Sequence, residues 1–183
     1  MHRRGPGRTL LCVLALVAGG LLGCEEKVKP SILRGIDSQT LPSQESWNST
    51  VVISDSGHVK AVIDAGYIRV FDAERQTLLS EGVVVRFFDE HGRQTSELHS
   101  REAKVDDRTN NLEAMGQVVV TSSDSTVLKT EHLFWDNVNH RIHTPDEVWI
   151  TSPKETLQGK GFEAQQNLKN YRIFQVSGEA RAK

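Results

Sequence analysis

The side chains with the most chemical potential in this sequence are two histidines and a set of aspartates. His140 and His143 could supply half of a metal site, but no third ligand follows at a suitable spacing, and both lie in or beside a polar turn. Paired carboxylates such as Asp106 and Asp107 can mark a glycosidase, yet Asp106 and Asp136 occupy equivalent places in the chain and each begins a predicted turn. Since there is also no nucleophile elbow and no zinc-type set of Cys and His, the sequence predicts no enzyme, no bound metal and no cofactor.

A repeated pattern of apolar residues and glycines indicates which structural elements hold these side chains. Its four members are Leu78-x3-Gly82-x-Val84, Leu112-x3-Gly116-x-Val118, Ile142-x3-Asp146-x-Val148 and Phe174-x3-Gly178-x-Ala180, at nearly even intervals along the chain. A second series lies between them, with Leu98, Leu128 and Leu157 as its first residues. A regular period of this size is typical of a stacked supersecondary unit. Such a stack spreads its side chains evenly instead of gathering them in a catalytic pocket.

From Thr50 onward the sequence predicts β-strands throughout. Runs of β-branched and aromatic residues, such as 83–88 and 171–176, alternate regularly with turn signals such as 107–111. No window of a dozen residues shows a helical period. We therefore expect an all-β fold, a meander of antiparallel hairpins in which each repeat contributes to both walls of a stack. The net charge of −2 and the absence of a Lys/Arg cluster predict no nucleic-acid partner.

The N-terminal segment has the pattern of an export signal. Arginines precede an apolar core over 10–22 that is too short to span a bilayer comfortably. The core ends in Leu21-Leu22-Gly23-Cys24, which resembles the lipobox of bacterial lipoproteins, where the signal is cut before a Cys that becomes lipid-modified. We expect a signal over 1–23, a tether over 24–49 that starts at a lipidated Cys24, and one domain over 50–183. An ordinary signal peptide or a short membrane anchor with a chance Cys is the alternative.

Apolar residues at alternate positions are predicted to line the space between two sheets. An ordinary closed sandwich core would show the same alternation. Small residues recur where a core would want bulk, and a meander that never closes leaves its first and last strands open to another sheet; both count against a closed sandwich core. The predicted groove residues, which line this space and which the resemblance given next implies bind lipid, are Leu78, Val84, Leu112, Val118, Val120, Leu128, Leu133, Ile142, Val148, Ile150, Leu157 and Phe162.

Several of these stretches together resemble the LptC family, the membrane-anchored periplasmic component of the lipopolysaccharide export machine. The similar stretches are 82–89, 116–120, 128–136, 142–144, 148–150 and 157–162, within a resemblance that covers roughly 54–178. The resemblance implies an open, twisted antiparallel β-jellyroll with an apolar groove. It also implies that lipopolysaccharide arrives from an inner-membrane ABC transporter, whose permease subunits carry a periplasmic jellyroll, and passes on to an LptA-like bridge protein.

The resemblance further implies where partners and membrane lie. The N-terminal edge would meet the transporter jellyroll, and the C-terminal edge, with Phe174, Val176 and Gly178, would meet the LptA-like protein. The best-known members carry a spanning helix, whereas a lipid on Cys24 would hold this chain at the periplasmic face of the inner membrane, with the outer membrane as the alternative. The rival interpretations are an LptA/OstA-type lipid carrier, a surface lipoprotein that binds polysaccharide, and a structural scaffold.

Two further residues have two interpretations each, and for a third the sequence predicts which face of the sheet it occupies. Arg86 is either salt-bridged or a phosphate contact at the groove mouth, and Trp135 either caps the groove or packs outside it. Trp149 alternates with Val148 and is expected on the opposite face. Glutamate at Val118 or Val148 is expected to block lipid passage while the domain still folds.

Overall fold

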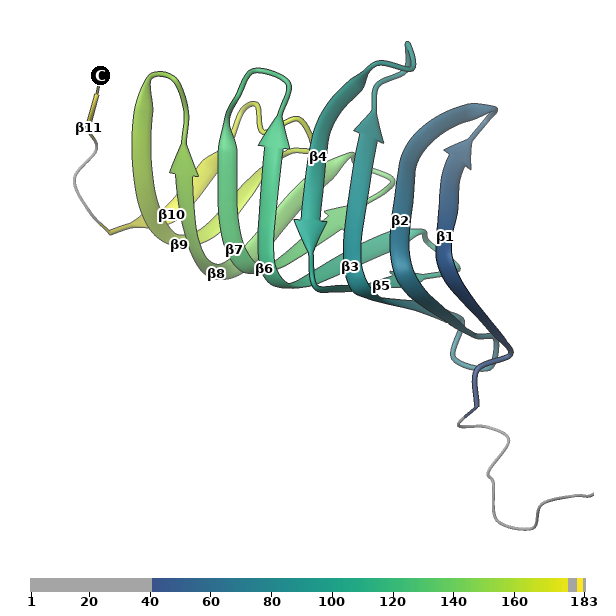
Figure 1. The fold of residues 1–183 in the computed structure, drawn as a ribbon. Helices are drawn as coiled ribbons and strands as arrows, with labels where there is room; N and C mark the ends of the chain where they lie inside the picture. The colour runs from purple at the N-terminus through teal and green to yellow at the C-terminus, as the bar shows by residue number, and fades with distance from the viewer. Residues whose placement is uncertain (1–40, 178–180, 183) are drawn as a thin grey trace, which may run out of the picture. The chain divides into compact units, whose positions relative to one another are not determined.

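The computed structural model describes residues 41–177 together with 181 and 182. The predicted signal, Cys24, most of the predicted tether and Gly178 lie outside these residues. The described part folds as predicted, as an all-β antiparallel sheet that contains no helix within these residues (Figure 1). Over the same residues, no helix has the length and hydropathy that a membrane span requires.

The described strands form one sheet whose order follows the chain except at β5 and β11. Their bounds are β1 (Gln44–Asp55), β2 (His58–Phe71), β3 (Gln76–Phe88), β4 (Gln94–Ser100), β5 (Glu102–Asp106), β6 (Asn111–Ser122), β7 (Val127–Asp136), β8 (Arg141–Thr151), β9 (Glu155–Gln165), β10 (Arg172–Val176) and β11 (Arg181–Ala182). The order is β1-β2-β3-β4-β6-β7-β8-β9-β10, with β5 between β3 and β6 and β11 beside β9. Nearly every connection is a short hairpin, as the turn signals predict.

The long strands bend near their middle, so each contributes to two layers (Figure 1). The strand pairing shifts register at the bend, between Ala65 and Tyr67 in β2 and between Met115 and Val118 in β6. At the same level, Arg101 interrupts the strand structure and separates β4 from β5. We call layer one the part with β4 and the halves of β3 and β6 that pair with it, and layer two the part with β5 and the opposite halves.

The sheet begins earlier than the predicted domain boundary at residue 50. Within β1, residues 44–47 already pair with 67–70 of β2. The early part of β1 shows no apolar alternation, because it is an edge strand whose side chains are mostly exposed. The predicted tether therefore extends too far along the chain, and the first half of β1 replaces its last residues.

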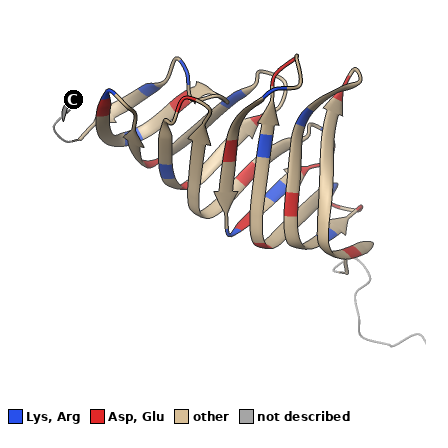
Figure 2. Cartoon of the chain, turned by 45° about the horizontal axis from the view of Figure 1, so that its top comes forward, with Lys and Arg blue, Asp and Glu red and all other residues tan. Residues whose placement is uncertain are grey.

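A single apolar core fills the space between the layers. It runs from Ile53 in β1 to Ala164 in β9. Phe87 of layer one meets Trp135 of layer two with ring centroids 5.0 Å apart at an interplanar angle of 58°, a favourable tilted geometry. On the strands, acidic and basic residues are interspersed, without a broad region of one sign (Figure 2).

Candidate functional site

The space between the layers is the candidate site, and most of the predicted groove residues lie in it. Nine of them are at most 2% exposed: Leu112, Val118, Val120, Leu128, Leu133, Ile142, Val148, Ile150 and Phe162. Leu157 is half-buried, opposite Ile150 in the β8–β9 pair. The apolar lining also extends beyond the predicted set, through Ile63, Leu79 and Leu98 in β2, β3 and β4. The interior thus crosses almost the whole sheet, from strand to strand.

Two predicted groove residues, Leu78 and Val84, lie on the outer face of β3 instead. Leu78 is paired with Arg69 and Lys104, whereas Leu79 is paired with the buried Ile68 and Ala103. The inward residues of the second half of β3 are likewise the neighbours of Val84, not Val84 itself. The prediction for these two residues is wrong by one position, which in a strand moves a side chain to the opposite face.

The cause of this error is the place of glycine in the bend. Both β3 and β6 bend at two successive residues with positive φ: Glu81 (61°) and Gly82 (85°) in β3, Gly116 (75°) and Gln117 (52°) in β6. Glycine is the second residue of the pair in β3 and the first in β6. A repeat aligned on glycine therefore places β3 one residue out of phase. Aligned on the bend, Val83 of β3 corresponds to Val118 of β6, and both are buried.

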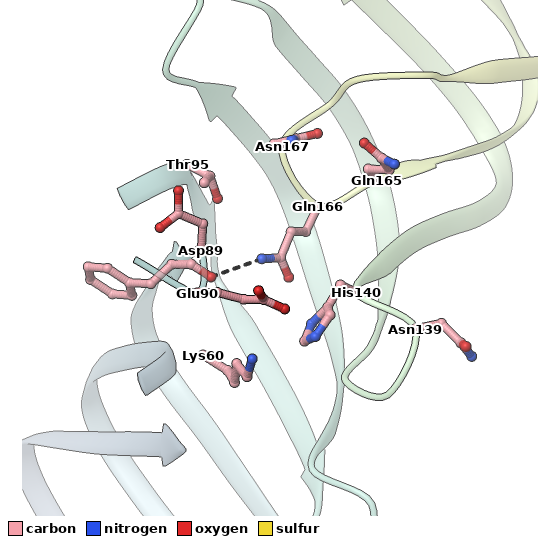
Figure 3. Close-up of a pocket in the computed structure, with 10 residues that line it drawn as sticks. Lys60, Asp89, Glu90, Thr95, Asn139, His140, Gln165, Gln166 and Asn167 are labelled. Atoms are coloured by element: carbon pink, nitrogen blue, oxygen red, sulfur yellow. Dashed lines mark hydrogen bonds between the residues drawn. The ribbon is translucent and has the colours of Figure 1, made fainter. Parts of the chain in front are cut away.

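Opposite the bend, the turn between β9 and β10 closes the space between the layers. Its first residue, Gln166, is 8% exposed, and its side-chain amide donates to the carbonyl of Phe88 in β3 at 3.2 Å (Figure 3). The indole Nε1 of Trp135 donates to Gln166 Oε1 at 3.1 Å. Trp135 is thus neither an outside residue nor a free cap: it is buried in the interior and hydrogen-bonded to this turn. Sequence reasoning missed Gln166, since a lone Gln in a polar turn has no distinctive pattern.

A pocket of about 320 Å³, lined mainly by polar and charged residues, lies beside this turn. Lys60, Glu90 and His140 line it together with Gln166 (Figure 3). Lys60 is only 8% exposed, and His140 Nδ1 is buried without a hydrogen-bond partner. The side chain of Glu90 lies in the same pocket, so the local charge is mixed. His143 lies elsewhere, stacked on Phe134 at 5.3 Å, and no three His, Cys, Asp or Glu residues cluster as a metal site among the described residues.

The aspartates singled out from the sequence hold turns. Asp106 Oδ1 accepts from the backbone N–H of Arg108 at 2.9 Å and of Thr109 at 3.2 Å, and Asp136 Oδ1 accepts from the second and third residues after it at 3.0 and 3.1 Å. The Arg108 side chain, then its backbone N–H, lowers the pKa of Asp106 to about 2. These bonds confirm the structural interpretation, an Asx-type turn. Arg86 is paired with Asp64, which supports its salt-bridge interpretation.

Both outer strands of the described sheet expose apolar side chains. On β10, Phe174 and Val176 are 58% and 60% exposed. On β1, Trp47 and Val52 are 62% and 56% exposed, and Trp47 stacks on Tyr67 at 5.4 Å. The β10 residues belong to the predicted partner edge, whereas those of β1 were not predicted as exposed; Trp47 was expected in the tether and Val52 within the domain. Trp149 is 44% exposed, on the face opposite its buried neighbours, as predicted.

Comparison with known proteins identifies the family of this jellyroll. A family model described as "Lipopolysaccharide-assembly, LptC-related" matches residues 10–179. This chain belongs to the LptC family. It matches no curated protein in sequence. In structure it is similar to LptH of Pseudomonas aeruginosa, described as the LptA-homologous periplasmic component of the conserved lipopolysaccharide transport device, with a TM-score of 0.51 and 12% identity over 67% of this chain and 90% of that chain.

Membership of the LptC family confirms the resemblance and assigns this chain to lipopolysaccharide transport. It is a transport component and not an enzyme. At 12% identity the likeness to LptH shows the fold alone, and it confirms the β-jellyroll.

Proposed function

We propose that this chain is a lipid-anchored periplasmic carrier that takes lipopolysaccharide from the inner-membrane ABC transporter and passes it to an LptA-like bridge protein. The carrying observation is the interior itself: a water-excluded apolar lining that continues across strands from β1 to β9. The two outer strands expose apolar side chains at the two ends of this lining. A jellyroll added at either edge would extend the lining in the same direction.

The proposed work of the interior is physical. Each acyl methylene that leaves water gains roughly 0.8 kcal/mol, so a chain of about ten methylenes gains on the order of 8 kcal/mol if fully covered. A site that holds lipid this well needs an energy source to move it onward. The proposed source is the ATPase of the transporter, because the sequence has no phosphate-binding glycine loop.

The proposed anchor is a lipid on Cys24, which would hold the domain near the transporter without a spanning helix. Stable attachment takes about two lipid chains, which a modified N-terminal Cys can carry. Mass spectrometry of the purified chain tests this directly: a mature N-terminus at Cys24 carrying acyl groups is expected. A Cys24→Ser variant that stays in the membrane fraction and keeps residues 1–23 would show that the segment is an uncleaved anchor instead.

Photo-crosslinking in cells tests the conduit. A photoreactive amino acid at Val118 or Val148, both buried in the interior, is expected to form an adduct with lipopolysaccharide only when the ATPase is active. Val119 and Trp149 are matched controls, because each is the next residue of the same strand and faces outward. Equal adduct yields from inward and outward positions would overturn the conduit. The absence of an adduct at every position would overturn it as well.

The edge assignment has its own test. Phe174→Asp with Val176→Asp is expected to weaken co-purification of an LptA-like protein, since both side chains are exposed on the outer strand β10. Trp149→Asp, on the exposed face of β8, is the control and should leave co-purification unchanged. Lipid adducts in a protein that carries no lipid on Cys24 would favour the LptA/OstA-type alternative. Absence of lipid adducts with the partner still bound would favour a scaffold.

A further inference from the structure

Gln166 makes four hydrogen bonds with its four polar groups, each to a different segment. Its backbone N–H donates to the carbonyl of His140 at 3.0 Å, and its backbone carbonyl accepts from Ser96 Oγ at 2.6 Å. Its side chain bonds the Phe88 carbonyl and the Trp135 indole at 3.2 and 3.1 Å. The partners lie at the end of β3, in β4, in β7 and in the β7–β8 turn. No hydrogen-bonding group of this buried residue is left unused.

Two of these bonds, those with Phe88 and Ser96, join the two layers on the side away from the bend, and the other two hold the turn to its own layer. Phe88 and Ser96 belong to layer one, whereas Trp135 and the turn that contains Gln166 belong to layer two. The same turn also places Leu168 in the core, at 4% exposure and with a positive φ of 60°. The β9–β10 turn, residues 166–171, is therefore fastened to the opposite layer by polar bonds and by an apolar side chain.

An acyl chain that reaches the interior from this side meets a space already filled by packed side chains. The layers must separate to admit it. At the bend they are joined by continuous backbone and cannot part, so separation has to take place at the opposite side, where Gln166 ties them together. The nearby pocket, lined by Lys60 and Glu90, would keep a sugar headgroup hydrated while the chain enters.

We infer that the β9–β10 turn is a strap, that Gln166 is its fastening residue, and that the strap must release for the acyl chains of lipopolysaccharide to enter the interior between the layers. This inference rests on the proposed function and deepens it: it assigns the side by which lipid enters. Once inside, the acyl chains pass along the lining from edge to edge as proposed above. The rival is entry through the end of the lining at β1, which needs no release of the strap.

The first test removes the side-chain bonds of Gln166 and keeps its backbone bonds. The full chain carries a photoreactive residue at Val118 and is mixed with purified lipopolysaccharide, and the initial rate of adduct formation is measured. Gln166→Leu is expected to raise this rate by up to about ten-fold, the effect of losing the one side-chain hydrogen bond that joins the layers in the closed state. Gln165→Leu is the matched control: its side chain is exposed in the adjacent position, and no change is expected.

The second test locks the strap. Cysteines at Ser96 and Gln166, whose atoms already meet across the layers, are joined by a short thiol-specific crosslinker with a cleavable bond. The locked protein is expected to lose most of the adduct, and cleavage should restore it. Adduct formation at the wild-type rate in both the locked protein and Gln166→Leu would overturn the strap and leave the conduit standing. No adduct in the wild-type protein would overturn the proposed function, and the strap with it.

Discussion

Leucine-to-alanine substitutions at two adjacent positions of β3 test which face of this strand is inward. Leu79 is 1% exposed and sits between Ile68 and Ala103, whereas Leu78 is half-buried between Arg69 and Lys104. Leu79→Ala should lower the free energy of unfolding by about 3 kcal/mol, within the usual range for buried leucines. The loss comes from the buried apolar surface that is removed and from the cavity that is left behind. Leu78→Ala removes only contacts with long polar side chains and should cost less than about 1 kcal/mol.

Urea unfolding followed by tryptophan fluorescence measures the difference, because Trp135 is buried and changes environment on unfolding. For a domain of this size an m value of about 2 kcal/mol per molar urea is expected. Leu79→Ala should then lower the midpoint by about 1.5 M and Leu78→Ala by less than about 0.5 M. A larger loss for Leu78→Ala would refute the register and restore the repeat aligned on glycine.

Three further measurements test other contacts of the sheet and its turns. Burial, and then the hydrogen bond that Tyr171 donates to Glu155, raise the pKa of Tyr171 to about 12. This pKa lies above the unfolded value of about 10, so the stabilisation is complete below that value and lost as pH rises toward the folded pKa; Tyr171→Phe should flatten stability over that window in alkaline unfolding curves. NMR titration of Asp106 should give a midpoint of about 2, and Arg108→Ala should move it up toward the ordinary value of 3.8. Gly159→Ala would put a methyl carbon 2.4 Å from backbone of β10, so hydrogen exchange should show β10 exchanging faster while β6 and β7 stay protected.

Much of the fold was predictable because the turns and the alternation are local signals. Runs of β-branched residues between Asx-type turns placed the strands after Thr50, and the regular recurrence of one apolar pattern indicated a stack. The first half of β1 was not predictable in the same way. An edge strand with polar exposed side chains buries little, so residues 44–47 carry no hydrophobic pattern.

The interior was predicted well where the repeat and the bend agree, and poorly where they do not. In β6 and β8 the inward positions follow from alternation, and Leu112, Val118 and Ile142 are buried. In β3 the glycine sits one place later in the bend, a difference of backbone conformation that no composition or spacing rule records. Gln166 was missed for another reason: its role comes from four partners that are distant in sequence.

The structure also changes one expectation about variants. Glutamate at Val118 or Val148 was expected to leave folding intact, but both side chains are at most 1% exposed. A carboxylate there has no ion-pair partner and is costly to bury. The cost would consume a large part of the folding free energy, which for a domain of this size is typically on the order of 10 kcal/mol. A loss of lipid passage in such variants would report unfolding as much as a blocked interior, so the photo-crosslinking test above is preferable to these variants.

The interior runs across the strands, so its length depends on how many strands the sheet has and not on how long each strand is. Neighbouring strands are about 4.8 Å apart, and the nine strands along the sheet path therefore give a lining on the order of 40 Å. Duplication of one hairpin would lengthen it by about 10 Å without changing its cross-section. A lineage can thus match the reach of this protein to the width of its envelope by gaining or losing hairpins, while the contacts that hold an acyl chain stay the same.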